Sequence, residues 1–249
     1  MFIGLMVGVA VGLSGIGGAA LSAPFLILLG VPPVNVVGSD LAFNAATKAL
    51  GSILNLKRRN IAFPALKRLV AGSIPALILG SITIKQVKEI AGWTSLNKLT
   101  LISIGIVLVT VSIQLILTPR RKASPIKRTG DPRLTTLVGF AVALPLTLTS
   151  IGAGSLTSPY LMKTLSSPRK VTGTTILYGL IISSLATALH LNLGTVKPSI
   201  FIPMLAGSIP GVYLGVKFND HLSLNKLRLT LSLLILASGL ATLLKLIHP

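Results

Sequence analysis

Eight apolar stretches, most of them about as long as a membrane-spanning helix, dominate this sequence. They cover residues 2–30, 34–56, 62–84, 97–118, 134–164, 168–192, 198–218 and 224–247. A helix needs roughly 20 apolar residues to cross the hydrocarbon core of a bilayer. Hydrophobic residues make up 51% of the chain and charged residues only 11%. The sequence therefore predicts an all-α polytopic membrane protein.

The large excess of basic residues is explained by membrane topology. The chain has 23 Lys and Arg against 4 Asp and Glu, a formal net charge of +19. In a soluble protein this balance would suggest nucleic-acid binding. Here the cations lie between apolar stretches, and Lys and Arg are retained on the cytoplasmic side of spanning helices. We therefore expect a lipid bilayer as the partner, and no nucleic acid.

The composition also argues against several kinds of chemistry. The sequence has no cysteine, which excludes disulfides and thiolate metal sites, and its three histidines and four acids are widely scattered. It contains no Ser/His/Asp triad, carboxylate pair, HExxH motif or P-loop. We expect no enzyme activity, no metal and no cofactor.

The eight stretches form two sets of four that repeat one another at a constant offset of 135 residues. The matches are Gly4 with Gly139, Pro24 with Pro159, Pro33 with Pro168, Gly38 with Gly173, and the string Ala-Gly-Ser-Ile-Pro at 71–75 with 206–210. Between the sets lies a basic, proline-containing linker, residues 119–133. The predicted organisation is a first transmembrane repeat at 1–118, a cytoplasmic linker at 119–133, and a second transmembrane repeat at 134–249.

The first element of each repeat is interrupted by small residues. Gly-Ile-Gly-Gly at 15–18 breaks stretch 2–30, and Ser-Ile-Gly-Ala-Gly at 150–154 breaks stretch 134–164. Each element is either one broken spanning helix or a re-entrant hairpin of two half-helices. A spanning element would give four crossings a repeat and parallel repeats, whereas a hairpin would give three crossings and inverted repeats.

The distribution of cations favours inversion. The inverted arrangement places most Lys and Arg, including Lys163, Arg169 and Lys170, on the same side as the linker. The parallel arrangement places these three residues on the opposite side of the membrane and divides the cations more evenly between the two sides. Because cytoplasmic loops carry the excess of Lys and Arg, the inverted arrangement agrees better with the charges.

The small-residue tips and one intramembrane lysine predict an anion site. If the tips meet near the midplane, two half-helix N-termini direct unpaired amides and positive dipole ends to one place. Lys48 lies centrally in an apolar stretch, where a charge should face a cavity or a partner. The expected substrate-binding residues are Ser14, Gly15, Gly17, Gly18, Ser22, Asn44, Lys48, Thr149, Ser150, Gly152, Gly154, Ser155 and Thr157. The alternatives are glycines that only permit close helix packing and a lysine that only supports the structure.

Three further residues are candidates for coupling or gating. They are Asp40, Thr175 at the aligned position of the second repeat, and Tyr178, which aligns with Phe43. Capping or backbone bonding explains the first two equally well, and aromatic packing explains Tyr178. His190 is expected to lie at the membrane interface and not to relay protons.

The ordered set of motifs resembles the sulfite exporter TauE/SafE family of prokaryotic membrane permeases. The resemblance rests on the duplication, on Gly-Ile-Gly-Gly-Ala-Ala-Leu-Ser-Ala-Pro at 15–24, on Gly-Ser-Asp-Leu at 38–41 and on the basic linker. In the family's corresponding Gly-Thr-Ser-Leu string a small hydroxyl residue stands where this chain has Asp40. That carboxylate is expected to change the substrate or to bind a coupling proton.

The resemblance implies a multi-pass protein of the prokaryotic cytoplasmic membrane that moves small sulfur oxyanions or organosulfonates, usually outward. Together with the residues it predicts a secondary transporter that alternates access around a midplane site. An anion channel and a non-transporting assembly partner stay open as alternatives. Self-association through the spaced glycines is a further expectation.

Overall fold

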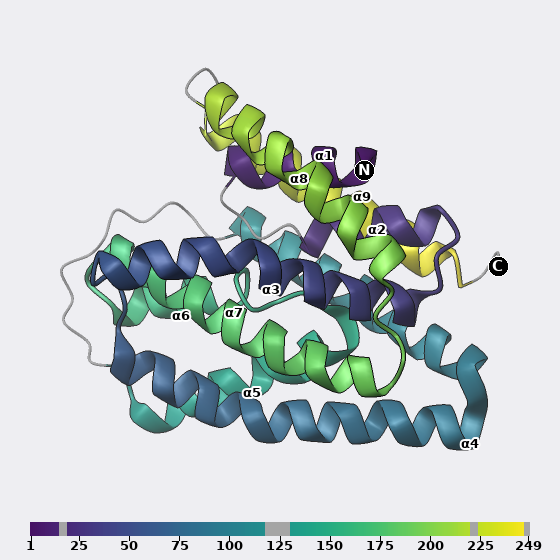
Figure 1. Cartoon of the computed structure of the whole chain (residues 1–249). Helices are drawn as coiled ribbons and strands as arrows, with labels where there is room; N and C mark the ends of the chain where they lie inside the picture. Colours follow the sequence, from purple (N-terminus) through teal and green to yellow (C-terminus); the bar gives the residue numbers. More distant parts are fainter. Residues whose placement is uncertain (15–18, 118–129, 220–223, 247–249) are drawn as a thin grey trace.

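The computed structural model describes residues 1–14, 19–117, 130–219 and 224–246, and within these ranges the chain is helical with no strand (Figure 1). The helices are α1 (Phe2–Ser14), α2 (Ala19–Leu28), α3 (Pro33–Lys57), α4 (Phe63–Leu117), α5 (Pro132–Thr149), α6 (Thr157–Thr164), α7 (Pro168–Asn192), α8 (Pro198–Asn219) and α9 (Leu224–Leu244). The all-α fold predicted from the apolar stretches is confirmed.

Both predicted first elements are broken helices. In the first repeat α1 ends at Ser14 and α2 begins at Ala19, and in the second α5 ends at Thr149 and α6 begins at Thr157. At 1.5 Å a residue, the ten residues of α2 and the eight of α6 reach only about 15 Å and 12 Å. Neither of these half-helices can cross a hydrocarbon core of about 30 Å alone.

Two expected stretches are joined in α4, which bends at Gly92. This glycine has φ 76° and ψ 177°, outside the helical region, so it divides α4 into two helical arms. In the part of the chain that the structure describes, four segments are long and apolar enough to cross a membrane: Phe63–Leu117, Pro132–Thr149, Pro168–Asn192 and Pro198–Gly215. The protein is thus a multi-pass membrane protein.

The two repeats make matching contacts with each other. The backbone N–H of Lys197 donates to Ser39 Oγ at 3.0 Å, and that of Ala62, the equivalent of Lys197, donates to Thr174 Oγ1 at 2.9 Å. Left-handed backbone conformations occur at equivalent positions as well, at Arg59 (φ 55°) and Gly194 (φ 72°). The sequence offset of 135 residues therefore relates contacts in space.

The equivalent helices α3 and α7 pack against each other and run in opposite directions. Gly38, near the start of α3, lies against Thr195, just beyond the end of α7. Conversely, Gly173, near the start of α7, lies against Asn60, just beyond the end of α3. Antiparallel equivalent helices are the geometry that inverted repeats require.

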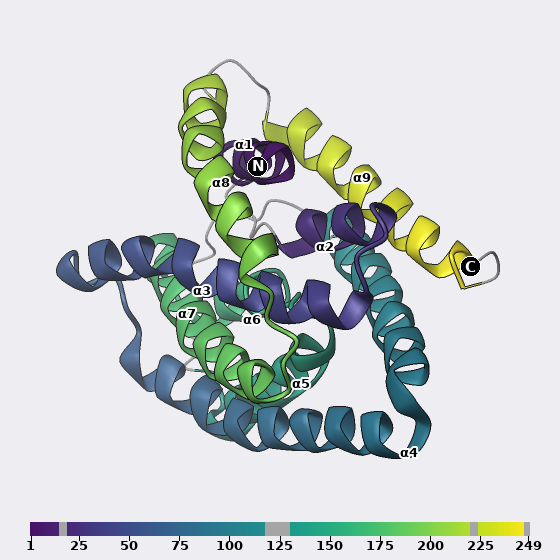
Figure 2. The ribbon, with the colours of Figure 1, turned by 45° about the vertical axis from the view of Figure 1, so that its right-hand side comes forward.

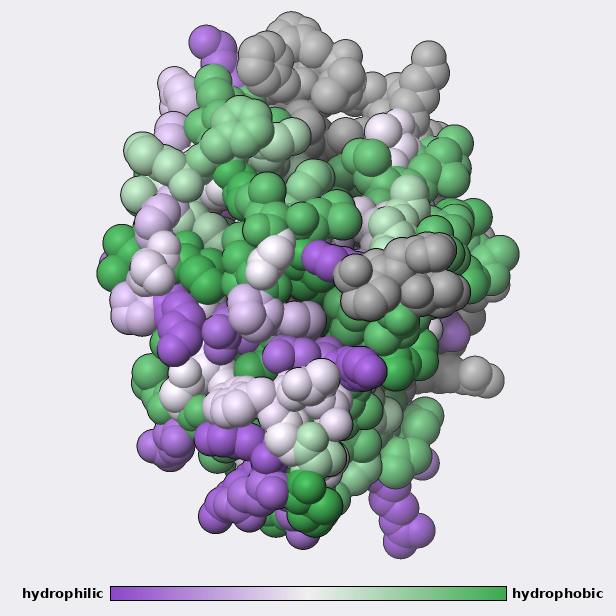
Figure 3. All heavy atoms as spheres, turned by 90° about the vertical axis from the view of Figure 1, so that its right-hand side faces the viewer, coloured by the Kyte–Doolittle hydropathy of each residue, from purple (hydrophilic) through white to green (hydrophobic). Residues whose placement is uncertain are grey.

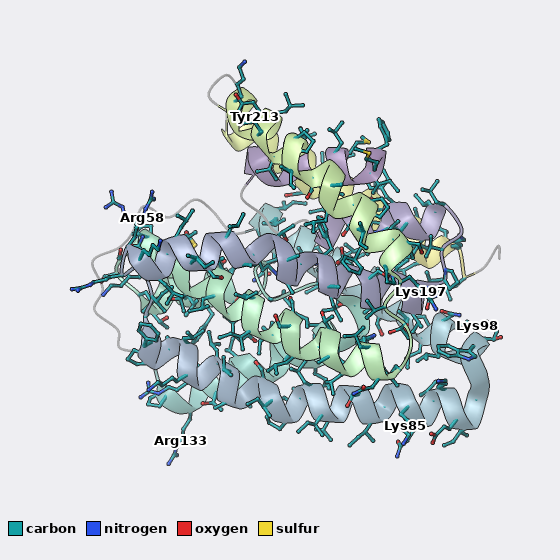
Figure 4. All side chains as sticks on the ribbon, in the orientation of Figure 1. Arg58, Lys85, Lys98, Arg133, Lys197 and Tyr213 are labelled. Carbon is teal, nitrogen blue, oxygen red and sulfur yellow. The ribbon has the colours of Figure 1, made fainter. Side chains whose placement is uncertain are left out.

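The basic side chains separate toward opposite ends of these helices. Figure 4 shows Arg58 and Arg133 toward one end, and Lys98 and Lys197 at the other. The inverted arrangement assigns these two groups to opposite sides of the membrane. Which end faces the cytoplasm stays a prediction.

The first helix of each repeat packs on the third element of the other repeat. α1 lies along α8, and α5 lies along the first arm of α4 (Figures 1 and 2). Glycines allow this approach: a Cβ at Gly4 would overlap the backbone of Met204, and one at Gly139 would overlap the backbone of Leu69. These pairs are related by the same offset of 135 residues.

Apolar and polar side chains are distributed as expected for a protein in lipid. Large apolar residues such as Leu50, Ile78 and Leu233 are exposed, whereas Ser22 and Asp40 are fully buried. Figure 3 faces the end that carries Lys98 and Lys197, and its hydrophilic residues gather in the middle and lower part beside broad hydrophobic areas. Exposed apolar surface of this extent suits contact with acyl chains.

Single cysteines test the arrangement of the repeats, because the chain has none of its own. We expect Lys85→Cys and Lys197→Cys to react with a membrane-impermeant thiol reagent from one side of the membrane. Arg58→Cys and Arg169→Cys should react from the opposite side. Labelling of Arg169→Cys from the same side as Lys197→Cys would contradict inverted repeats.

Gly139→Ala tests the contact between α5 and α4. The added methyl group would overlap the Leu69 carbonyl, a backbone atom that cannot rotate away. We expect a loss of about 1–3 kcal/mol in the free energy of unfolding, measured in detergent. The control is Gly51→Ala, whose methyl group would meet only the Ile176 side chain at 3.3 Å. Equal stability of Gly139→Ala and Gly51→Ala would show that α5 and α4 can move apart at this contact without loss of stability.

Candidate functional site

The buried carboxyl group of Asp40 joins three segments of the chain. Ser22 Oγ on α2 donates to Asp40 Oδ1 at 2.5 Å, and Ser150 Oγ, just after α5, donates to Oδ2 at 2.6 Å. Asn44 Nδ2, one turn further along α3, also donates to Oδ2, at 2.9 Å. A buried carboxylate needs such donors in place of water. Asp40 therefore connects α2 and α3 of the first repeat with the small-residue tip of the second.

Ser150 adopts a backbone conformation that is costly for a residue with a side chain. Its φ of 60° and ψ of −4° lie in the left-handed region and end helix α5. Left-handed geometry costs an L-residue roughly 1–2 kcal/mol, and such strain persists where the surroundings hold it in place. The bond to Asp40 and the bond from the Ser150 N–H to Leu146 O, at 2.7 Å, provide that support.

Lys48 lies two turns beyond Asp40 on α3 and is half-buried against α7. A Cβ added at Gly179 would lie 3.0–3.1 Å from Lys48 Cδ, Cε and Nζ, so the lysine occupies the space that this glycine leaves. The two charges interact, yet among the described residues no carboxylate lies within 4.0 Å of Lys48 Nζ. The ammonium group thus keeps its hydrogen-bonding capacity for another ligand.

A small cavity lies beside Lys48 and the tip of the second repeat. Its lining residues are Ala20, Asn44, Lys48, Ser150, Ile151, Gly152, Ala153, Gly154 and Ser155. Its volume is about 20 Å³, which is room for about one water molecule. In this conformation a larger anion requires the walls to move apart.

The structure brings six of the predicted site residues to this cavity: Asn44, Lys48, Ser150, Gly152, Gly154 and Ser155. The cavity is also lined by the small or apolar side chains of Ala20, Ile151 and Ala153, which were not predicted as site residues. Their proximity to the tip glycines was the only signal in the sequence. The start of α2, through Ala20, and the tip before α6 both line this cavity.

Other predicted hydroxyl groups bond to the protein itself. Ser22 donates to Asp40, Thr149 Oγ1 donates to Pro145 O at 2.8 Å, and Thr157 Oγ1 donates to Ala153 O. Amides near the start of α6 are also engaged, because Leu156 N–H donates to Gly152 O at 3.0 Å. The donors that face an anion are thus fewer than the sequence suggested.

The gating candidates on α7 occupy different surroundings. Thr175 is a neighbour of Gly154, since a Cβ added at this glycine would lie 4.0 Å from Thr175 Cγ2. The buried hydroxyl of Thr175 has no hydrogen-bond partner among the described residues. Tyr178 OH is 2.7 Å from Ser73 Oγ on α4, and Ser73 also donates to Gly139 O on α5 at 3.0 Å. Tyr178 therefore lies where α7, α4 and α5 meet, outside the cavity lining.

His190, expected at the membrane interface, lies in the last turn of α7 and is buried in the protein. It is only 1% exposed, and its ring nitrogens lie 2.8 Å from Thr195 Oγ1 and 2.9 Å from Thr147 O. Asn55 and Asn60 form the equivalent pair in the first repeat. This symmetry marks a structural connection at the end of each second element.

Four predicted residues lie outside the described part of the site. Gly15, Gly17 and Gly18 fall between α1 and α2, in the interval 15–18 that the structure does not describe. The side chain of Ser14, the last residue of α1, is likewise outside the description. Their place in the anion site stays a prediction.

Comparison with known proteins identifies the family. Residues 1–242 match the family described as Sulfite exporter TauE/SafE. The chain belongs to this family. It is also 34% identical, over 251 aligned residues, to a protein of Bacillus subtilis (strain 168) named "Probable membrane transporter protein YjnA". The alignment covers 96% of this chain and 97% of that relative. No solved structure matches the chain.

Family membership and helical structure together show a multi-pass membrane transporter of the TauE/SafE family. The resemblance seen in the sequence motifs is confirmed over nearly the whole chain. Within this TauE/SafE protein, the buried Asp40 and the half-buried Lys48 contact both repeats in the part of the chain that the structure describes.

Substitutions of Ser150 test whether its bond to Asp40 holds the strained tip. Ser150→Ala removes a hydrogen bond to a charged group, worth about 1.5–3 kcal/mol, and keeps the strain. Ser150→Gly loses the same bond but relieves the left-handed backbone. We expect Ser150→Gly to be about 1 kcal/mol more stable than Ser150→Ala in thermal or denaturant unfolding. Equal losses would show that the backbone stores no strain.

Proposed function

We propose that this protein is a secondary transporter of small sulfur-containing anions, such as sulfite or organosulfonates, in a prokaryotic cytoplasmic membrane. The observation that carries the proposal is the ammonium group of Lys48, which borders a cavity between the two repeats without a carboxylate within 4.0 Å among the described residues. A cation inside the membrane is costly unless it meets a partner. An anionic substrate supplies that partner.

The family description supports sulfur as the element transported. The matching family is described as a sulfite exporter, and the Bacillus subtilis relative is named a probable membrane transporter. Sulfite and sulfonates are compact anions whose oxygens accept several hydrogen bonds, which suits an ammonium group with nearby hydroxyls. Export is the direction that the family description favours.

Alternating access is the mechanism that this architecture favours. The site lies between α3, the antiparallel α7 and the tip after α5, and the cavity is too small for an oxyanion in this conformation. Rocking of one repeat against the other would open the cavity toward each side in turn. The matching contacts between the repeats make the two open states structurally similar.

Ligand-dependent stability tests the anion site. The purified protein is heated with sulfite, thiosulfate, sulfate, sulfoacetate, acetate, chloride or simple cations. An anion at 100 times its Kd adds about 2.7 kcal/mol to the stability of the folded state, which raises the unfolding midpoint. We expect sulfite or a sulfonate to stabilise the wild type, and Lys48→Ala to lose this response. Lys85→Ala is the control, because Lys85 is exposed and lies 3.9 Å from Glu89.

Transport into liposomes then separates the alternatives. A transporter shows saturable uptake and counterflow of the stabilising anion, whereas a channel shows neither. Stabilisation by acetate but not by sulfite or sulfonates would contradict the sulfur substrate. Absence of any anion response in the wild type would contradict the transporter proposal and favour an assembly partner.

A further inference from the structure

The carboxyl group of Asp40 occupies the donors that an incoming anion would use. Ser22 and Ser150 direct their hydroxyl groups to it, and Lys48 is the charged group that interacts with it. An ionised Asp40 would repel a second anion beside Lys48 in this low-dielectric region. The carboxylate therefore acts like a tethered anion already present at the site.

The distances around Asp40 fit hydrogen bonds and are shorter than those between neighbouring oxygen ligands of one metal ion. The two hydroxyl oxygens lie 2.5 and 2.6 Å from the carboxylate oxygens, within the range of O–H···O⁻ bonds. Even Mg²⁺, with octahedral ligands at about 2.0–2.1 Å, keeps neighbouring ligand oxygens about 2.9 Å apart. The coupling ion that this geometry accepts is a proton.

We propose that Asp40 binds one proton whenever the transporter binds one anion, so that the two move together. This inference rests on the proposed function. The proton from water adds to a carboxylate oxygen and converts –COO⁻ to –COOH. The acid now donates a hydrogen bond, so Asp40 can accept fewer, and Ser150 Oγ is released to donate to the anion. The bound anion replaces the ionised Asp40 as the negative charge that interacts with Lys48, and the net charge of the site is unchanged.

Among the described residues around Asp40, no other group is placed to bind the coupling proton. α2 and the tip after α5 contribute the hydroxyls of Ser22 and Ser150, and α3 contributes Asn44 and Lys48. On α7, Tyr178 pairs with Ser73, and His190 pairs with Thr195 and Thr147. The remaining described charges on α4, α5, α7 and α8 lie near helix ends or beside the Gly92 bend of α4, namely Lys67, Arg68, Lys85, Lys88, Glu89, Lys98, Arg133, Arg169, Lys170 and Lys217.

Thermodynamic linkage between proton binding and anion binding predicts how the Kd for the anion depends on pH. If anion binding takes up one proton, the proton must increase anion affinity by the same factor by which the anion increases proton affinity. Over the pH range in which Asp40 is ionised, the apparent Kd should then increase about tenfold for each pH unit. A strong-acid anion is the proper probe, because sulfite itself titrates.

The experiment measures binding of methanesulfonate, whose sulfonate stays ionised, to the full-length protein in detergent at several pH values. Calorimetry in two buffers of different ionisation enthalpy counts the protons taken up. For the wild type we expect a Kd that increases about tenfold per pH unit and uptake of about one proton per anion. Asp40→Asn should bind with a Kd independent of pH and no proton uptake. Glu89→Gln, which changes an exposed carboxylate, should behave as the wild type.

A second variant keeps the proposal testable if Asp40→Asn does not fold. Asp40→Thr introduces the residue type that the chain itself carries at the equivalent position, Thr175, and should also lose the pH dependence. Binding to the wild type without pH dependence or proton uptake would overturn the proton inference and leave the anion site intact. Unchanged proton uptake in folded Asp40→Thr would overturn it as well. No binding of any anion to the wild type at any pH would instead overturn the proposed function.

Discussion

A carboxyl group buried in a membrane helix must find its hydrogen-bond donors inside the protein, and the centre of this structure satisfies that requirement for Asp40. The donors come from α2, from α3 and from the tip that follows α5. One of them, Ser150, keeps a left-handed backbone. Asn44 and Ser150, which bond to this carboxyl group, also line the cavity beside Lys48, so the buried group and the cavity share their polar walls.

Contacts between the repeats divide into those that occur twice and those that occur once. The bonds of Ser39 and Thr174 to the opposite repeat are duplicated, as are the glycine contacts of Gly4 and Gly139. The group around Asp40 and Lys48 is not, because Thr175 and Ser183 stand at the equivalent positions. Duplicated contacts can persist when the repeats exchange conformations, since each has a counterpart. Because the polar group around Asp40 and Lys48 has no counterpart in the other repeat, the state open to one side of the membrane can differ chemically at this group from the state open to the other side.

Much of the fold could be predicted from the sequence because lipid imposes simple rules. Long apolar stretches marked the helices, the constant offset marked the duplication, and the Gly-rich interruptions marked the broken first elements. The site was harder to predict. The apolar surroundings of Lys48 and the small residues of the tips marked candidate residues, but no local pattern indicated that Ser150, 110 residues away, would bond to the carboxyl group of Asp40. Ser73 and Tyr178 likewise meet only through packing of α4 against α7. Side-chain partners between distant elements depend on tertiary geometry, which one sequence does not reveal.

The exchange of first helices between the repeats has a consequence for biogenesis. α1 finds its packing surface on α8, which the ribosome makes about two hundred residues later, so the first half must wait in the bilayer with its glycine face uncovered. α5, in contrast, meets α4 as soon as it inserts. The same exchange bears on ancestry. A gene encoding a single repeat would have produced a first helix without the partner surface that the other repeat now supplies.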